Sequence, residues 1–313
     1  MKNINQDEFL EIVKMLEIDD FENICNTNKK FKFYCNKYKY ILMKNLLKKN
    51  NVEYKNPHCL IYSKNVVLHK DPKLLVYTAF KLYLTFYRLE EINCANKNIN
   101  SIPNLPNVKT LNCRKNNLST LPFLPKLTTL ECGENYIKVL PELPHIIHLN
   151  CTSNMLDILP NLPKIKRLLC GNNNLTILQN LENVEILNCV ENNLSFLPHL
   201  PNVHTLFCHN NFLTIIPPLE NVKILNCAHN QIISLQYLPK VKTLYCYNNL
   251  LTMLPPLPNV VELYCDNNML DTFPFLPNIK ILGYQNNLFS PEEIERIHIL
   301  IDQNLIVQEL LEN

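Results

Sequence analysis

Cysteine is the residue type in this chain best suited to chemistry, and its spacing is unusual. The 313-residue chain has 13 cysteines, and ten of them follow one another at an interval of nineteen residues. Thiolates hold metal ions and form disulfides, but zinc sites typically use a C-x-x-C pair, and none occurs here. We therefore interpret the evenly spaced cysteines as small buried apolar residues. They are Cys94, Cys113, Cys132, Cys151, Cys170, Cys189, Cys208, Cys227, Cys246 and Cys265.

Histidine and glycine offer little support for catalysis. His204, His209 and His229 fall in adjacent intervals, yet no carboxylate stands where it could orient them. Asp266 follows His209 by three intervals. Three glycines are too few for a Gly-rich phosphate-binding loop. They are Gly133, Gly171 and Gly283, all at expected strand positions. The sequence therefore predicts a protein that is not an enzyme and needs no cofactor and no metal.

The regular interval defines a repeating unit. Counted from Cys113, a leucine lies two residues before, an asparagine three after (Asn116) and a leucine five after (Leu118). A return arm, Leu-Pro-x-Leu-Pro, closes the unit at residues 121–125. This is the pattern L-x-x-L-x-(L/C)-x-x-N-x-L, and the chain resembles the leucine-rich-repeat family over residues 89–290. Eleven units of nineteen residues fit, with Tyr284 in the eleventh cysteine position.

The resemblance implies a solenoid in which each column of the repeat has a physical role. Residues Leu111-Asn112-Cys113 alternate inward and outward as in a strand, and stacked units pair such strands into a parallel sheet. The asparagine column can satisfy backbone groups between neighbouring repeats. Two prolines three residues apart disfavour a helix in the return arm. We expect a parallel β-sheet on the concave face, an extended polyproline-like convex side, a small α-helical N-terminal module and a C-terminal capping helix.

Residues 1–50 are expected to form that N-terminal module. Their helical spacing, the turn at residues 18–21 and the apolar residues that follow resemble an F-box, a three-helix module that binds a Skp1-type adaptor of a cullin-based ubiquitin ligase. The usual Leu-Pro pair is replaced by Asn5-Gln6, and the chain has no tryptophan after the third helix. The resemblance implies that Phe9, Ile12, Leu16, Phe21 and Ile24 contact the adaptor.

The remaining ends are expected to shield the solenoid. Residues 51–88 form a linker and a helical N-terminal cap, with Asp71-Pro72 as a helix start. Residues 291–313 form a C-terminal capping helix, started by a capping box of Ser290 and Glu293. Its apolar face is predicted to contain Ile294, Ile297, His298 and Ile301.

The compartment is predicted from the same features. The first thirty residues lack the apolar core of a signal peptide, and no run of about eighteen apolar residues occurs. Many thiols suit a reducing compartment. As a whole the chain resembles a giant-virus (mimivirus-like) F-box/leucine-rich-repeat protein, which implies an intracellular protein in the cytoplasm of an infected host cell.

Charge is concentrated in one segment. The formal net charge is only +2, but residues 1–90 hold 16 Lys/Arg against 10 Asp/Glu. The basic excess lies between Lys29 and Lys55 with aromatic residues interleaved, an arrangement that suits nucleic acid. The alternative is a helix with aromatics facing a core and lysines facing water. We favour the helix, and we expect neither nucleic acid nor a membrane as a partner.

Outward strand positions carry a group of aromatic residues. Such side chains are typical of interface hot spots, so we predict that a protein target binds here on the concave face. Aromatics also suit strand surfaces in general, which is the alternative explanation. Two hypotheses follow: a substrate-recognition adaptor of a ubiquitin ligase, or a non-catalytic binding or structural repeat protein with no ligase link. The oligomeric state is not predicted. The candidate residues are Phe207, His209, Tyr245, Tyr247 and Tyr264.

Overall fold

The computed structural model describes residues 89–299. The predicted F-box-like module (1–50), the predicted linker and cap (51–88) and the end of the capping helix (300–313) lie outside the described residues. The described residues belong to two units, divided after Leu127, and each is described by itself.

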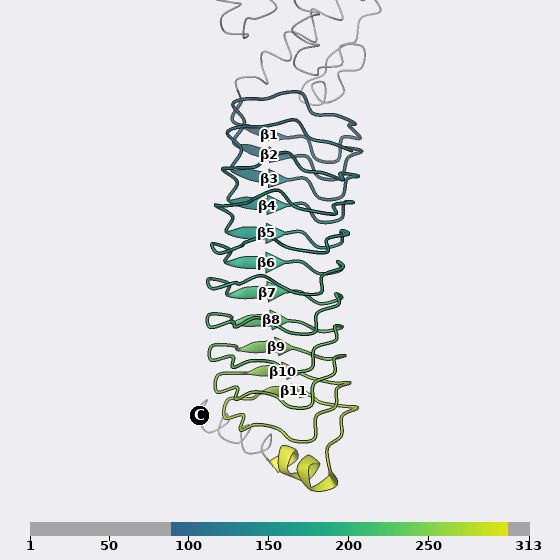
Figure 1. The fold of residues 1–313 in the computed structure, drawn as a ribbon, viewed down its shortest axis with the longest axis vertical. Helices are drawn as coiled ribbons and strands as arrows, with labels where there is room; N and C mark the ends of the chain where they lie inside the picture. Colours follow the sequence, from purple (N-terminus) through teal and green to yellow (C-terminus); the bar gives the residue numbers. More distant parts are fainter. Residues whose placement is uncertain (1–88, 300–313) are drawn as a thin grey trace, which may run out of the picture. The chain divides into compact units, whose positions relative to one another are not determined.

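The described residues contain eleven strands of three residues each (Figure 1). In the first unit β1 pairs with β2, and in the second unit β3 to β11 form one parallel sheet in sequence order. The strands are β1 Glu91–Asn93, β2 Thr110–Asn112, β3 Thr129–Glu131, β4 His148–Asn150, β5 Arg167–Leu169, β6 Ile186–Asn188, β7 Thr205–Phe207, β8 Ile224–Asn226, β9 Thr243–Tyr245, β10 Glu262–Tyr264 and β11 Ile281–Gly283.

The repeat sets the register of the sheet. Each described pairing joins residues nineteen positions apart, as Leu244 of β9 with Leu263 of β10. The middle residue of each strand points into the core, and the outer two are at least partly exposed in most strands. The predicted parallel sheet is therefore confirmed. Gly133 and Gly171 were expected within strands, but they lie beyond the ends of β3 and β5.

The ten evenly spaced cysteines are all free and buried. Each directly follows a strand and packs beside the leucines of the core, for example Leu187 and Leu194 around Cys189. Burial raises the pKa of the Cys151, Cys189 and Cys227 thiols to about 12, because a thiolate would lose its hydration there. They are therefore protonated at neutral pH, as expected of apolar core residues.

The chain turns away from the sheet two residues after each cysteine. The residue there has a positive φ in every described repeat, between 51° and 56°. Asparagine tolerates this left-handed region better than most residues, and it fills the position at Asn172, Asn210 and Asn248 among others. Part of the asparagine content of the chain thus has a conformational cause that the repeat pattern did not reveal.

The predicted asparagine column, three residues after each cysteine, bonds neighbouring repeats together. Asn192 is buried, and its Nδ2 donates to the carbonyl oxygens of Cys170 (3.0 Å) and Cys189 (3.2 Å). Its Oδ1 accepts the Leu175 N–H at 3.0 Å. The same contacts recur at Asn173, Asn211, Asn249 and Asn268. One amide thus satisfies backbone groups of two repeats, as the sequence indicated.

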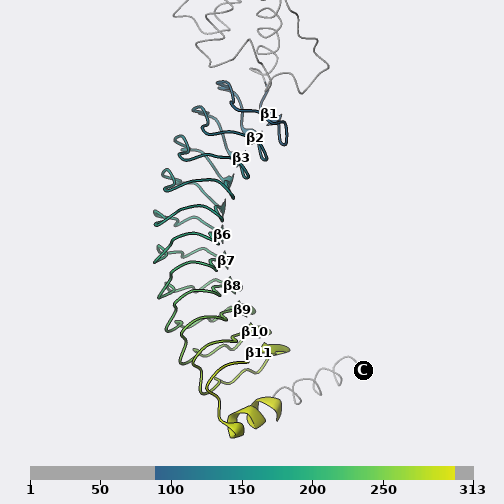
Figure 2. The ribbon, with the colours of Figure 1, turned by 90° about the vertical axis from the view of Figure 1, so that its right-hand side faces the viewer.

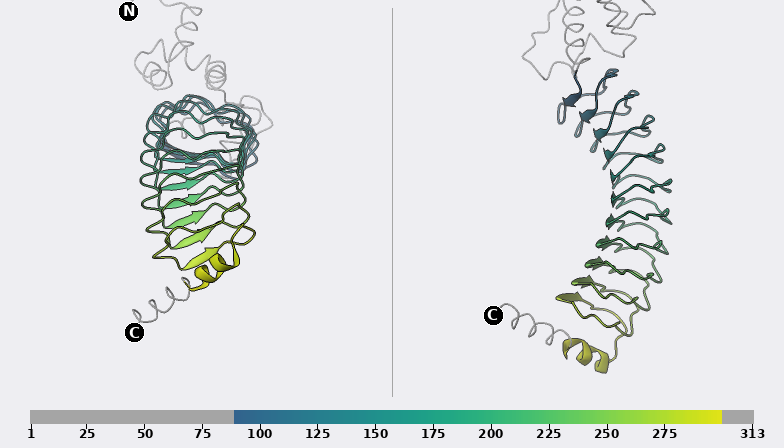
Figure 3. Two further views of the ribbon diagram at one scale, coloured as in Figure 1. Left: turned by 60° about the horizontal axis from the view of Figure 1, so that its bottom comes forward. Right: turned by 90° about the vertical axis from the view of Figure 1, so that its left-hand side faces the viewer.

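The return arms contain no helix within residues 89–290. Their leucines are buried and the prolines between them are partly exposed, as at Leu197, Pro198 and Leu200. The arms follow extended paths from one strand to the next, as Figure 3 shows for β3 to β11. This agrees with the predicted extended convex side.

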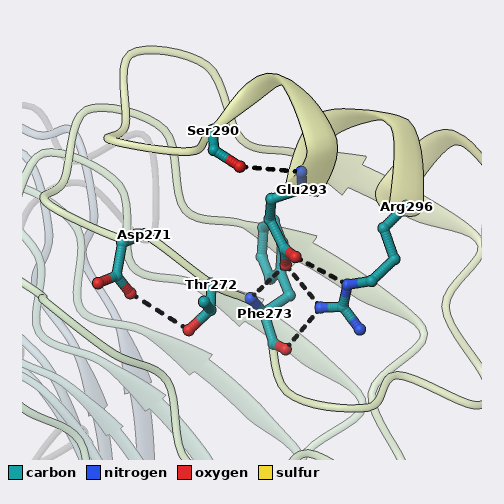
Figure 4. A network of polar contacts seen from close by, with 6 residues as sticks. All are labelled: Asp271, Thr272, Phe273, Ser290, Glu293 and Arg296. Atoms are coloured by element: carbon teal, nitrogen blue, oxygen red, sulfur yellow. Dashed lines mark hydrogen bonds and ion pairs between the residues drawn. The ribbon is translucent and has the colours of Figure 1, made fainter.

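A helix that begins at residue 291 follows the last repeat (Figure 4). Ser290 Oγ accepts the Glu293 N–H at 3.2 Å, which is half of the expected capping box. The Glu293 carboxylate instead accepts the Phe273 N–H at 2.9 Å and pairs with Arg296, whose guanidinium also donates to the Phe273 oxygen. These bonds attach the helix to the last return arm.

The buried face of this helix is narrower than predicted. Ile297 is buried and Ile294 is half-buried, as expected. His298 is exposed, and its Nε2 lies 3.0 Å from the Tyr284 hydroxyl, so it does not belong to the apolar face. Ile301 lies outside the described residues.

Candidate protein-binding face

In the second unit the strands line the concave side of the stack (Figure 2). Parallel strands lie about 4.8 Å apart, so side chains at one column of the repeat form a row along this face. The first and third residues of each strand point outward, and the third is the residue just before the cysteine. The row formed by the third residues contains three of the predicted contact residues: Phe207, Tyr245 and Tyr264.

Tyr245 and Tyr264 form the centre of the aromatic group. They are paired in register at the ends of β9 and β10, and their rings stack with centroids 5.0 Å apart and planes 9° apart. Gly283 occupies the same column in β11, where a Cβ atom would come within 3.0 Å of the Tyr264 ring. Because Gly283 has no side chain, the Tyr264 ring can occupy this position without a steric clash. Burial and the nearby Glu262 raise the pKa of Tyr245, so its hydroxyl is neutral and can donate a hydrogen bond.

A second row lies one residue after the cysteine, just past the strand ends. Tyr247 belongs to it and meets His229 edge to face, with ring centroids 5.2 Å apart. His209 lies two repeats earlier, and Ala228 between them is fully buried. Sequence reasoning did not assign His229 to this face, because it stands in the column of positive-φ residues.

His209 is partly buried in this row. Its Nδ1 is buried and has no hydrogen-bond partner among the described residues. Burial lowers the pKa of His209, and the nearby Glu191 offsets part of the effect. The ring is therefore neutral at pH 7, so this part of the face is uncharged.

The residues that directly precede the cysteines also have a structural role. Where it holds asparagine, the side-chain oxygen accepts the N–H two residues later, as Asn188 does for Val190 (3.3 Å) and Asn226 for Ala228 (3.2 Å). The same bond occurs at Asn93, Asn112 and Asn150. An aromatic ring cannot accept this bond, so Phe207, Tyr245 and Tyr264 give up a local stabilisation of about 1 kcal/mol each.

We refer to Phe207, His209, Tyr245, Tyr247 and Tyr264 as the aromatic patch. The structure places all five on the concave face of the second unit and stacks Tyr245 on Tyr264. Phe207 and His209 lie two repeats from Tyr245 and Tyr247, about 9.6 Å away along the stack. Exposed lysines line the side of the patch where the strands begin: Lys223, Lys242 and Lys280.

Within residues 89–299, no three His, Cys, Asp or Glu side chains come together as a metal ion would require. In the same range no helix has both the length and the apolar character needed to cross a membrane.

Solved structures with the same architecture decide the fold class. The leucine-rich-repeat domain of APL1B is 21% identical, with 71% of this chain and 75% of that chain covered and a TM-score of 0.56. The fold is a leucine-rich-repeat solenoid. The functional domain of InlJ from Listeria monocytogenes, which includes a cysteine ladder, is 21% identical over 64% of this chain and 54% of that chain, with a TM-score of 0.50. The LRIM1 leucine-rich-repeat domain is 20% identical over 66% and 77%, also with a TM-score of 0.50. No family profile and no curated protein matches the sequence.

The likeness to these structures concerns the fold, and stacked repeats of this kind present an extended concave surface. Neither the family profiles nor the curated proteins support the F-box resemblance or the giant-virus resemblance.

Proposed function

We propose that this chain is a non-catalytic protein-binding protein that holds its target on the concave face, at the aromatic patch. The observation that carries the proposal is the loss of asparagine from the row before the cysteine at Phe207, Tyr245 and Tyr264. Five asparagines in this row each make a stabilising local bond, and the aromatic residues give it up. Residues that break a local rule are typical of functional sites.

Ring stacking offsets part of that loss but not at every position. The Tyr245–Tyr264 stack contributes about 0.5–1.5 kcal/mol. Large rigid side chains on a broad surface are what protein interfaces use as anchors.

The test compares two pairs of tyrosines. Tyr245→Ala with Tyr264→Ala removes the stack, and Tyr136→Ala with Tyr237→Ala removes two tyrosines that are 53% and 56% exposed outside the strands. Proteins captured from a lysate by the full wild-type chain are identified by mass spectrometry. The target should be lost from the first variant and kept by the second. A target retained by both variants would refute the aromatic patch as its binding site.

We also propose, from the sequence resemblance of residues 1–50, that the captured target is delivered to a ubiquitin ligase. In this role Phe9, Ile12, Leu16, Phe21 and Ile24 contact a Skp1-type adaptor, and the aromatic patch recognises the substrate. The alternative is a leucine-rich-repeat binding or structural protein with no ligase link. The cytoplasm of an infected host cell is the compartment that this proposal implies.

Co-purification of the full chain with a Skp1-type adaptor separates these two functions. Saturable binding that is lost in Leu16→Asp with Phe21→Asp supports the adaptor role. No binding at micromolar concentration leaves the alternative, and target capture by the aromatic patch is then unaffected.

A further inference from the structure

The lysines beside the aromatic patch differ from the other lysines in their column of the repeat. This column directly precedes each strand. Lys166 Nζ pairs there with Glu185 Oε1 of the next repeat at 2.9 Å, and Lys109 pairs in the same way with Glu90 at 2.8 Å. We call the lysines of this column that form no ion pair within residues 89–299 the lysine row: Lys223, Lys242 and Lys280.

Two members of the lysine row lie on neighbouring strands. The Lys242 N–H donates to the Lys223 oxygen at 2.8 Å, and both side chains are exposed. Like charges on neighbouring strands destabilise a sheet. The fold does not require lysine in this column, because Thr128 and Val261 occupy it in other repeats. Residues that are kept at a cost in stability are typical of functional sites.

Two carboxylates lie near the tyrosines of the patch, and neither pairs with the lysine row. Glu262 follows Val261, the residue that interrupts the row, and it forms no ion pair among the described residues. Burial, and then the charge of Glu262, raise the pKa of Tyr245. Asp266 lies past the end of β10, where its Oδ1 accepts the Gln285 N–H at 2.9 Å. The unpaired positive charge is therefore confined to the side of the patch at which the strands begin.

The lysine row and the tyrosines lie on the two sides of a strip of the concave face. Lys242 directly precedes β9 and Tyr245 ends it, so the two sides are about 10 Å apart. The strip between them contains exposed apolar side chains at Ile224 (37%) and Ile281 (45%). The lysine row extends over three repeats, which is about 14 Å along the stack.

An extended peptide matches these dimensions. It rises about 3.3 Å per residue and points successive side chains to opposite sides. The first, third and fifth residues of such a peptide lie on one side and span about 13 Å, which is close to the length of the lysine row. The second and fourth residues then point to the side of the tyrosines.

We propose that the part of the target that binds at the aromatic patch is an extended acidic segment, in which carboxylates alternate with apolar side chains. This inference rests on the proposed function, because it assigns a chemistry to the target of the same face. The carboxylates pair with the lysine row, as Glu185 pairs with Lys166. The apolar side chains on the other side of the segment pack against Tyr245 and Tyr264.

A nucleic acid also carries negative charge, but the patch suits it less well. Tyr245 and Tyr264 stack on each other with planes 9° apart, so no base can insert between their facing sides. Asp266, just past the tyrosines, would repel phosphates placed on that side. An extended peptide turns its carboxylates to one side only, away from Asp266.

Isothermal titration calorimetry of the full chain with synthetic peptides tests the proposal. The probe is a peptide of about seven residues in which glutamate and leucine alternate, and the control peptide has glutamine in place of each glutamate. Three exposed ion pairs should make the acidic peptide bind about 3-fold to about 100-fold more tightly than the glutamine peptide. Raising NaCl from about 0.05 M to about 0.5 M should remove most of this difference.

The lysine-row variant, which combines Lys223→Gln, Lys242→Gln and Lys280→Gln, should bind the two peptides equally. The matched control combines Lys138→Gln, Lys164→Gln and Lys240→Gln, which removes the same charge from exposed positions outside the strands, and it should keep the difference. Because all six lysines are exposed, neither variant should unfold at a lower temperature than wild type.

Several results would overturn the proposal. One is an acidic peptide that does not bind at about 1 mM, and another is a preference for it that survives in the lysine-row variant. A preference that is lost equally in the matched control would also contradict it. An oligothymidylate of about twelve nucleotides that binds more tightly than the acidic peptide would make the face a nucleic-acid site instead.

The target captured from a lysate separates failure of this inference from failure of the proposed function. Loss of the target from both the lysine-row variant and the Tyr245→Ala, Tyr264→Ala variant is the expected result. A target that only the tyrosine variant loses binds at the aromatic patch without an acidic segment, so the inference alone is wrong. A target that the tyrosine variant keeps refutes the aromatic patch, and with it the inference.

Discussion

Asn192 offers a direct measure of how much the asparagine column stabilises the solenoid. Its side chain donates to the carbonyl oxygens of Cys170, Cys189 and Val190 and accepts the Leu175 N–H. Asn192→Ala leaves the Leu175 N–H without its acceptor, whereas the three carbonyl oxygens keep bonds from Asn173, Asn211 and the Asn172 N–H. A buried polar group left unsatisfied costs about 1–3 kcal/mol, so the free energy of unfolding should fall by about 1–3 kcal/mol.

Two further variants separate hydrogen bonding from packing. Asn192→Asp keeps the acceptor for the Leu175 N–H but turns a second oxygen toward the three carbonyls. Its carboxyl pKa should be raised in the folded state, so this variant should be more stable at pH 4 than at pH 7 relative to wild type. Asn193→Ala is the control, because Asn193 is the adjacent asparagine and is exposed, and it should cost less than about 0.5 kcal/mol.

Urea unfolding followed by far-UV circular dichroism and tyrosine fluorescence measures these differences, since the chain has no tryptophan. Repeat proteins can unfold in stages, so the two signals are compared at each urea concentration. If Asn192→Ala unfolds within about 0.5 kcal/mol of Asn193→Ala, water replaces the side chain and the reasoning is wrong.

Two other predictions concern the core and the C-terminal cap. Thiols of the unfolded chain ionise near pH 8.5, whereas burial raises the pKa of the Cys189 thiol to about 12. The free energy of unfolding should therefore fall as the pH rises between these values, and Cys189→Ala should make this slope less steep by about 1.4 kcal/mol per pH unit. An unchanged slope would contradict the burial of Cys189. Glu293→Ala removes the acceptor of the Phe273 N–H and should speed hydrogen exchange of that amide at least about fivefold. In wild type, the hydrogen bond from Arg296 lowers the pKa of Glu293, so its contribution is complete above about pH 4.3 and is lost as the pH falls through the folded value. If neither Glu293→Ala nor protonation of Glu293 at low pH reduces the protection of the Phe273 amide against exchange, the helix is not attached through Glu293.

Much of the fold follows from the sequence because one unit is repeated eleven times. The interval between cysteines sets the register of the sheet, and a column that is apolar in every unit must face the common core. Burial of Cys189 and the bonds of Asn192 could therefore be predicted from position alone. The helix start at Ser290 was likewise readable, because its capping bond joins residues only three apart.

The tertiary structure decided those side-chain contacts that depend on the path of the backbone between the repeated columns. Glu293 bonds to Phe273, twenty residues earlier, instead of completing the capping box, because the last return arm presents an N–H at that point. His298 faces Tyr284 at the surface, since the helix buries only the side that carries Ile297. The ring stack of Tyr245 and the outward direction of Phe196 likewise required the spacing and turn of adjacent repeats in three dimensions. The sequence by itself determined which residues repeat, and the packed structure determined which of them lie at the surface and which side chains they meet there.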